Sequence, residues 1–238
     1  MNEGYHVYAG YTRYVDFKRL DFIVRTVRSY FNNRTKLRGL DVGCGKGDIA
    51  VPLAFLGYIV VGIDICSEHV EEAKRWAEAK KAAEGNPTFL IGDAENLPFK
   101  VSSFDFAICS EVLEHLKRPE RALKRINKAL KEGGLLIVTV PNGYGSFSLI
   151  YDHFRNKIAS KVLPRIGSSD HIQFFTLSKI TGLIKEAGFE VLDIKHSDFV
   201  SFLPVLVKSK RFCYYDCKLA DKLPSLLVSG WYISCRRI

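Results

Sequence analysis

The chain has 238 residues, of which 47% are hydrophobic and 26% charged, so it is long enough for one sizeable core and ordinary for a soluble globular protein. No apolar run approaches the roughly 18 residues that a membrane span needs, and the N-terminus lacks a signal-peptide pattern. We therefore expect a cytoplasmic protein.

The six cysteines form no CxxC pair, which favours reduced structural thiols over a disulfide framework. Cys213 and Cys217 are one helical turn apart, but no histidine follows them closely, so we expect no metal site.

The formal net charge of +9 is unevenly distributed. Residues 1–38 carry a net charge of +5, residues 39–143 carry −2 and residues 144–238 carry +6. Positive flanks fit an anionic substrate, an anionic membrane surface or RNA as partner, and a solvated basic face explains them equally well.

The N-terminal region predicts helical structure. Tyr5, Tyr8, Tyr11 and Tyr14 are three residues apart, which would align them along one side of a helix. They would either close over a ligand as an aromatic lid or pack on the edge of a sheet. Residues 16–33 continue as an amphipathic helix whose polar face includes Arg19.

The next element is a strand followed by a glycine turn. Residues 39–42 are apolar apart from Asp41, glycines follow at positions 43, 45 and 47, and a helix-compatible segment begins at Asp48. Such a turn at the carboxyl end of a parallel strand binds nucleotide-like ligands in open α/β sheets, although it can also be purely structural. Carboxylates at positions 41 and 48 repel a pyrophosphate but suit the ammonium and sulfonium of S-adenosylmethionine.

The β-branched segment 58–64 predicts a strand buried on both faces, and it ends in Asp64. An acidic residue about twenty positions after a glycine turn is placed to bind two ribose hydroxyls. A helix at 67–81 and a strand at 88–91 follow. Asp93 comes next and would lie on the same edge, where it binds an adenine amino group or caps its own loop.

The remaining elements continue the alternation. We expect a strand at 104–109, a helix from Pro119 to about residue 131, and a strand at 135–140. Alternating strands and helices imply parallel strands joined by right-handed crossovers. The last third contains an insert at about 144–170, a helix at 176–187, a strand at 189–196, an insert at about 198–228 and a strand at 230–236.

Four motifs now stand in order: Leu40 to Gly47, Gly62-Ile63-Asp64, Asp93 to Phe99, and Phe104-Asp105 through Ser110-Glu111-Val112-Leu113-Glu114-His115. Together they resemble class I S-adenosylmethionine-dependent methyltransferases, in particular the small-molecule branch with the ubiquinone and menaquinone biosynthesis enzymes. Beyond Gly143 only the segments 170–176 and 187–189 resemble the family.

The resemblance implies an α/β fold, a three-layer sandwich around a mostly parallel, seven-stranded Rossmann-like sheet whose antiparallel last strand lies between strands five and six. We expect an N-terminal helical lid at 1–38, from the tyrosine spacing, and a methyltransferase domain at 39–238 that carries the two inserts. It assigns Asp41 and the glycines to the methionine end of the cofactor, Asp64 to the ribose, Asp93 and Ala94 to the adenine, and Ser110 to the sulfonium. The predicted cofactor residues are Asp41, Gly43, Cys44, Gly45, Gly47, Asp64, Ile65, Asp93, Ala94 and Ser110.

Methyl transfer from a sulfonium requires alignment of the acceptor with the methyl group and exclusion of water. A general base is needed only when the acceptor must lose a proton. His171 is the best candidate, because its loop precedes a helix and should project over the cofactor edge. Glu111 is the second candidate, as a residue that shapes the acceptor site, whereas His115 is expected to pack at the start of its helix.

Both inserts mix apolar and basic residues, which suggests a hydrophobic acceptor with an acidic group, approached from a membrane surface, or a plain helical cap over the sheet. The sequence therefore predicts an enzyme that transfers a methyl group from S-adenosylmethionine to a small, apolar or lipid-like acceptor and releases S-adenosylhomocysteine. The alternatives are an RNA methyltransferase that uses the basic flanks and a non-catalytic S-adenosylmethionine-binding protein. RNA is the less favoured partner, because the motif after strand four lacks the Asn/Asp-Pro-Pro-Tyr pattern typical of base amino-group methylation.

Overall fold

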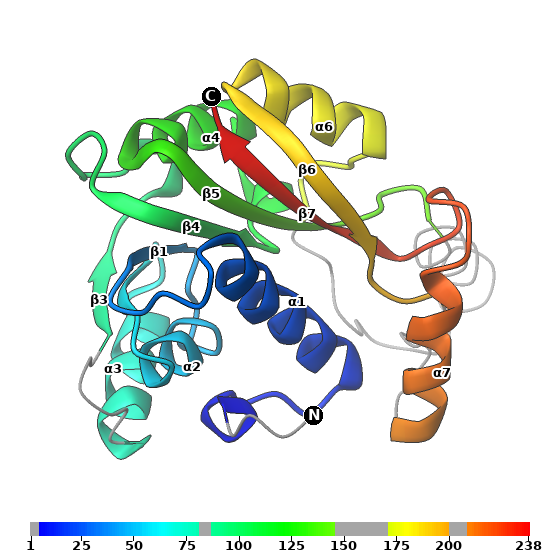
Figure 1. The fold of residues 1–238 in the computed structure, drawn as a ribbon, viewed down its shortest axis with the longest axis horizontal. Coiled ribbons are helices and arrows are strands. Elements are labelled where there is room, and N and C mark those ends of the chain that lie inside the picture. The colour runs from blue at the N-terminus through cyan, green and yellow to red at the C-terminus, as the bar shows by residue number, and fades with distance from the viewer. Residues whose placement is uncertain (1–4, 81–86, 146–170, 200–208) are drawn as a thin grey trace, which may run out of the picture.

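The structure, a computed structural model, describes residues 5–80, 87–145, 171–199 and 209–238. Its centre is a seven-stranded sheet with the strand order β3-β2-β1-β4-β5-β7-β6 (Figure 1). The strands are β1 (Arg38–Val42), β2 (Ile59–Asp64), β3 (Thr88–Ile91), β4 (Phe104–Ser110), β5 (Leu130–Pro141), β6 (Phe189–His196) and β7 (Gly230–Arg237).

Helices cover both faces of the sheet, with α4 and α6 on one face and α1, α2 and α3 on the other (Figure 1). The α-helices are α1 (Tyr14–Tyr30), α2 (Ala50–Phe55), α3 (Ser67–Lys80), α4 (Pro119–Ala129), α6 (Leu177–Glu186) and α7 (Lys210–Ala220). Short 3₁₀ helices are η1 (Tyr5–Tyr8), η2 (Ala94–Asn96) and η3 (Leu113–His115).

Strands β1 to β5 run parallel, and β7 pairs antiparallel with both β5 and β6. The predicted position and direction of the last strand are confirmed. Because β1 to β5 are parallel, their carboxyl ends meet at one edge of the sheet, which is where such folds bind ligands. Since β6 is antiparallel to β7, it runs parallel to β5 and also ends at this edge.

Each face of the sheet has its own hydrophobic core. On one face, α1 packs its fully buried stripe of Leu20, Ile23, Val24 and Val27 against the sheet, as its amphipathic pattern predicts. On the other face, α4 and α6 pack against β4, β5 and β7. The six cysteines are free, and five of them are buried, which confirms structural thiols.

One predicted boundary is wrong. The helix expected to extend to about residue 131 ends at Ala129, and β5 begins at Leu130, five residues before the predicted start. Leu130 is fully buried and pairs with Phe104, and the ladder resumes at Phe106 with Leu135. Tertiary pairing at Leu130 therefore outweighs the helical tendency of the preceding segment.

The four N-terminal tyrosines do not lie along one continuous helix. Residues 5–8 form a 3₁₀ turn, and α1 starts only at Tyr14. Between them the backbone N–H of Gly10 donates a 2.6 Å hydrogen bond to Asp48, which fixes this segment over the glycine turn. Its role as a lid stays a prediction. Most of the first insert (146–170) and part of the second (200–208) lie outside the described residues.

Candidate active site

The glycine turn after β1 opens the main chain to a ligand. Gly43 and Gly45 have φ angles of +69° and +50°, in the left-handed region that favours glycine. The backbone N–H groups of Gly43 and Cys44 both donate to the carbonyl of Ile63, at 2.7 and 3.0 Å, which docks the turn on β2. A Cβ atom at Gly43 would meet Val112 at 2.3 Å, whereas a Cβ atom at Gly45 would meet no atom of the described residues within 4 Å. Gly45 therefore faces open space.

Asp64 lies at the end of β2 and joins two turns of this edge. Its carboxylate accepts hydrogen bonds from the backbone N–H groups of Gly45 (2.8 Å) and Cys66 (2.9 Å). Each carboxylate oxygen has a second lone pair, so two hydroxyl groups of a ligand can still donate to it. The next residue, Ile65, is 75% exposed, as expected of a side chain that lies beside an open site.

Asp41 is the second-last residue of β1, beneath the glycine turn, and is almost completely buried. Its Oδ2 atom has no hydrogen-bond partner within the described structure. Burial raises the pKa of this carboxyl from its ordinary value of 3.8 to about 7, and the nearby carboxylate of Asp64 adds to the rise. An ammonium or sulfonium group placed above the turn would favour the ionised form, so the site is suited to a cationic ligand.

Asp93 follows β3 on the same edge and caps its own loop. It accepts hydrogen bonds from the Glu95 backbone (2.8 Å) and from the Asn96 side chain (2.6 Å). Glu95 in turn accepts from the backbone and side chain of Arg118, at 3.0 and 2.8 Å, so the loop is tied to the start of α4. The structure shows the capping role of Asp93. The contact of Asp93 and Ala94 with adenine stays a prediction.

A chain of hydroxyl and carboxylate groups lies where β4 ends. The hydroxyls of Ser110 and Thr139 are 2.9 Å apart, and Thr139 donates a 2.8 Å hydrogen bond to Glu111. The backbone of Glu111 has a φ angle of +55°, which is uncommon outside glycine and favours a functional constraint. Thr139 is fully buried, so it fixes the direction of the Glu111 carboxylate.

Arg19 of α1 belongs to this site, although the periodicity of the helix assigns it to the polar face. Its guanidinium lies 3.3 Å from Asp16 and 3.8 Å from Glu111, and its side chain is only 16% exposed. Arg19 lies 5.7 Å from the centre of the Tyr11 ring. Its positive charge counteracts the rise that burial causes in the pKa of Asp41.

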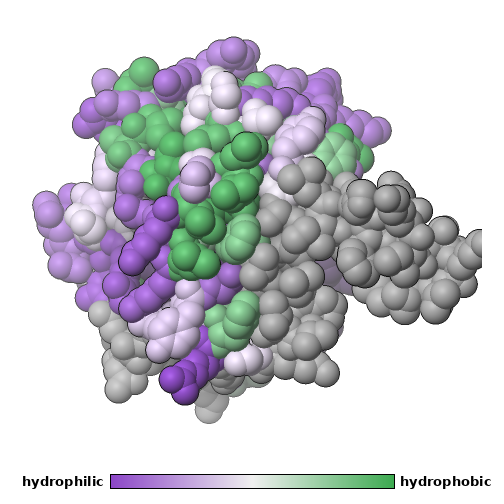
Figure 2. Space-filling model, turned by 90° about the vertical axis from the view of Figure 1, so that its right-hand side faces the viewer, coloured by the Kyte–Doolittle hydropathy of each residue, from purple (hydrophilic) through white to green (hydrophobic). Residues whose placement is uncertain are grey.

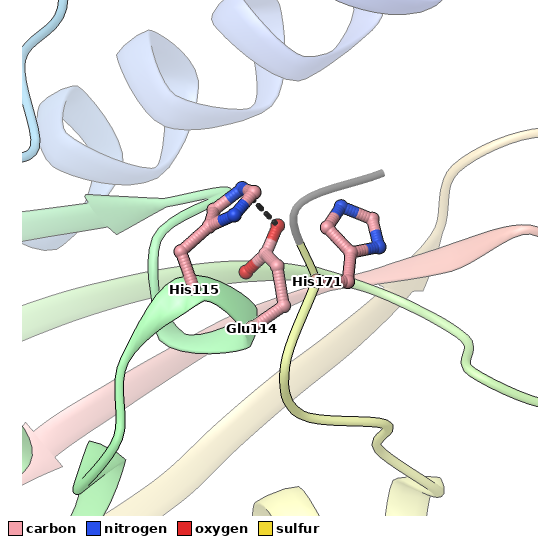
Figure 3. Close-up of side chains that lie close together, drawn as sticks. All are labelled: Glu114, His115 and His171. Carbon is pink, nitrogen blue, oxygen red and sulfur yellow. Dashed lines mark ion pairs between the residues drawn. The ribbon is translucent and has the colours of Figure 1, made fainter. Parts of the chain in front are cut away.

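Glu114, His115 and His171 form a cluster, called here the Glu-His-His cluster (Figure 3). The Glu114 side chain is 1% exposed and lies 4.0 Å from the His115 Nε2 atom, and neither of its oxygens has a hydrogen-bond partner among the described residues. Burial raises the pKa of Glu114 well above its usual range, and the carboxylate of Glu111 raises it further. The rings of His115 and His171 meet edge to face at 4.9 Å.

The two histidines come from different elements. Residues 171–173 are fixed beside η3, because the backbone N–H groups of Ile172 and Gln173 both donate 2.9 Å hydrogen bonds to the Glu114 carbonyl. His171 therefore does lie at the edge where the parallel strands end. The expectation for His115 is incomplete, because its side chain is 42% exposed and faces His171 instead of packing into the start of α4.

Comparison with known proteins identifies the family. Residues 40–138 match the model of a methyltransferase domain. A ubiquinone biosynthesis O-methyltransferase of Coxiella burnetii is 31% identical over 177 residues, which are 72% of this chain and 73% of the relative. The chain belongs to the S-adenosylmethionine-dependent methyltransferases.

Solved structures support the fold of this methyltransferase. A possible histamine N-methyltransferase of Thermotoga maritima has a TM-score of 0.64 at 22% identity, over 98% of this chain and 92% of that one. Magnesium protoporphyrin IX methyltransferase of Synechocystis, crystallised with S-adenosylhomocysteine, has a TM-score of 0.65 at 20% identity, over 94% and 84% of the two chains. The expected family, fold and cofactor are confirmed.

The residues of this edge fit S-adenosylmethionine. The open space at Gly45 leaves room against the main chain, and the unpartnered Oδ2 atom of Asp41 lies beneath the turn. A methyltransferase takes its methyl group from the sulfonium of this cofactor and leaves S-adenosylhomocysteine. The exact contacts of the ten predicted cofactor residues stay predictions.

The Glu-His-His cluster also bears on the expectation that the site holds no metal. Its ligand atoms all lie within 4.8 Å of one another, and among the described residues it is the one group of side chains placed to hold a metal ion. Carboxylate and imidazole are ligands that divalent transition metals accept. Whether the enzyme works without a metal therefore stays a prediction that needs a measurement. Among the described residues, no helix is long and apolar enough to cross a membrane.

Proposed function

We propose that this methyltransferase transfers the methyl group of S-adenosylmethionine to a hydroxyl oxygen of a small, apolar acceptor. The observation that carries the proposal is the buried Glu114 carboxylate, which lies against His115 and His171 at the edge where β4 ends. A hydroxyl oxygen becomes a strong nucleophile when its proton is removed or a cation polarises it. The cluster is suited to either task, and the name of the Coxiella relative supports oxygen as the acceptor atom.

We assign the proton to His171, the residue that the sequence also favours. Its imidazole accepts the acceptor's proton as the methyl group transfers, and the imidazolium that forms favours the ionised form of the neighbouring Glu114, whose pKa burial raises. The Glu114 carboxylate lies between the side chains of His115 and His171 (Figure 3). Since the reaction itself is an in-line displacement, the other residues contribute mainly by alignment.

Glu111 and Ser110 supply that alignment on the side of the cofactor. Ser110 ends β4 beside the expected position of the sulfonium, and Glu111 comes next in the chain. The hydrogen bond from Thr139 and the positive charge of Arg19 hold the Glu111 carboxylate in one direction. We infer that this carboxylate contacts the acceptor and not the adenosine, because Asp64 and Asp93 lie at the ends of β2 and β3, beyond β1.

The apolar character of the acceptor rests on the side chains near His171. Ile172 is 52% exposed and Phe174 is 47% exposed, and both lie within one short segment that begins at His171. Tyr144, at the end of β5, is 54% exposed, and the neighbouring Gly143 backbone donates to Phe175 at 3.0 Å. Exposed apolar groups beside a proton acceptor favour a hydroxyl compound with a hydrophobic body. Such an acceptor agrees with the membrane contact that the two inserts predict.

The proposal is tested with radiolabelled S-adenosylmethionine and matched acceptors. The panel pairs phenols with and without an alkyl chain, includes the corresponding anilines, and adds total RNA. We expect methylation of the alkylated phenols, and a large loss of turnover in His171→Gln with unchanged binding of S-adenosylhomocysteine. Methylation of anilines or RNA alone, or full turnover by His171→Gln, would contradict it. Turnover is measured again after dialysis against a chelator and after addition of Mg²⁺, Mn²⁺ or Zn²⁺. Turnover that depends on the added metal indicates cation binding at the cluster, and turnover that does not indicates proton acceptance alone.

A further inference from the structure

The second insert contains a helix whose outward face combines basic and apolar side chains. On α7 the residues Arg211, Tyr215, Lys218 and Leu219 are exposed, and they recur at intervals of three and four. The inward residues Cys213, Asp216, Cys217 and Ala220 are buried. The helix is therefore amphipathic, but its outward face is apolar as well as charged.

The turn that follows α7 extends this face. Lys222 is exposed, and Leu226 and Leu227 are 68% and 41% exposed. We call the exposed set the α7 face. It consists of Arg211, Tyr215, Lys218, Leu219, Lys222, Leu226 and Leu227. Figure 2 looks onto the side of the molecule where α7 lies and shows apolar residues gathered into a patch, with hydrophilic residues beside it.

These apolar side chains point outward from a well-anchored backbone. The buried amide of Asn142 donates to the carbonyls of Leu226 (3.2 Å) and Val228 (3.0 Å), and so ties the turn to the end of β5. The His196 ring bonds the Ala220 carbonyl at 2.8 Å and the Ser225 hydroxyl at 2.9 Å. The exposure of the leucines is thus a fixed property of the fold.

The two acidic residues near the α7 face are buried or paired with a cation. Asp216 is buried and accepts a hydrogen bond from the Phe199 backbone at 3.0 Å. Asp221 lies 2.9 Å from the Nζ atom of Lys18, which also bonds the Cys217 carbonyl at 2.9 Å. Among the side chains that the structure describes on α7 and its turn, the exposed charges other than Asp221 belong to Arg211, Lys218 and Lys222.

We propose that the α7 face binds an anionic lipid surface. Its basic side chains complement anionic headgroups, while Tyr215 and the three leucines enter the boundary between headgroups and acyl chains. The surface lies at the correct edge of the molecule, because α7 belongs to the insert between the end of β6 and the start of β7. It also packs against α1, where Tyr14 meets Tyr214 edge to face at 5.8 Å. Membrane binding through α7 would place the active-site edge beside the lipid, from which an apolar acceptor can enter.

The inference extends the proposed function by naming the surface from which the acceptor comes, and it is tested without acceptor or cofactor. The purified full chain is floated with vesicles of phosphatidylcholine alone or of phosphatidylcholine and phosphatidylglycerol. We expect flotation only with the anionic vesicles. Each basic residue near an anionic surface contributes to the partitioning of a protein onto it. The triple variant Arg211→Ser, Lys218→Ser and Lys222→Ser should therefore lower the partition coefficient onto anionic vesicles roughly a hundredfold.

A matched control removes the same charge elsewhere. Lys124, Arg125 and Lys128 are exposed on α4, and their replacement by serine should leave flotation unchanged. Leu219→Ser with Leu226→Ser should weaken binding, whereas Ile59→Ser with Ile91→Ser, at exposed positions near the other end of the sheet, should not.

The proposal is overturned if folded wild-type protein does not float with anionic vesicles, or if the α4 variant loses as much binding as the α7 variant. It is also overturned if the wild-type protein sediments as a dimer and the leucine variant as a monomer that still floats with the vesicles, because the α7 face would then be a dimer interface. Preferential binding of RNA to the α7 face over the vesicles would overturn it as well. Activity toward a water-soluble acceptor is measured separately, so a failure of the membrane inference leaves the proposed reaction intact, and the reverse also holds.

Discussion

The replacement of Asp41 by Asn should change how the stability of the enzyme depends on pH. In the folded protein, burial raises the pKa of Asp41 from 3.8 to about 7. The folded state therefore keeps the proton over a range in which the unfolded state has lost it. Because the unfolded state binds fewer protons there, the free energy of unfolding falls as pH rises from about 4 to about 7.

The size of this effect follows from the two pKa values. A shift from 3.8 to about 7 corresponds in total to about 4 kcal/mol of lost stability once pH exceeds both values. Between pH 5 and pH 8 the loss amounts to about 2.5 kcal/mol. Asparagine has no charge to lose, so the stability of Asp41→Asn relative to wild type should rise by that amount over the same interval.

Urea denaturation of both proteins at pH 5 and pH 8 measures this difference. The comparison cancels every other titrating group that the two proteins share. A difference in stability that is the same at both pH values would refute the assignment of a protonated, buried Asp41. A cationic cofactor favours the ionised carboxylate, so we also expect wild-type protein to release a proton when it binds S-adenosylmethionine near pH 7, as calorimetry in buffers of different ionisation enthalpy can show.

Three further substitutions test the site. Asp64→Ala should weaken binding of S-adenosylhomocysteine at least tenfold, or about 1.4 kcal/mol, and the loss should be smaller for the 2′-deoxy analogue, which keeps only one of the two ribose hydroxyls; equal losses for both ligands in a calorimetric titration would contradict the ribose contact. Gly45→Ala should cost only about 1–2 kcal/mol of stability, because its Cβ meets no atom of the described residues, yet abolish cofactor binding, whereas Gly43→Ala should unfold at a much lower temperature. Thr139→Val should lower kcat about tenfold or more by releasing Glu111, with recovery in Thr139→Ser; unchanged kcat in both variants would show that the bond is only structural.

The sequence by itself determined the sheet and its ligand edge. Strand positions followed from β-branched segments and from the glycine turn, because these local patterns reflect burial on both faces and a backbone that only glycine adopts easily. Asp41 and Asp64 could be named because both lie at the carboxyl ends of such strands, and the carboxyl ends of parallel strands must meet. His171 could be placed at the same edge because its loop precedes a predicted helix.

Only the tertiary structure decided which distant side chains complete the site. Periodicity assigned Arg19 to a solvated face, but the helix packs so that this guanidinium meets Glu111, a contact between segments about ninety residues apart in the sequence. His115 acquires its neighbour His171 through hydrogen bonds between η3 and the segment before α6. The start of β5 at Leu130 and the outward face of α7 likewise depend on pairing and packing across the fold, which no local pattern contains.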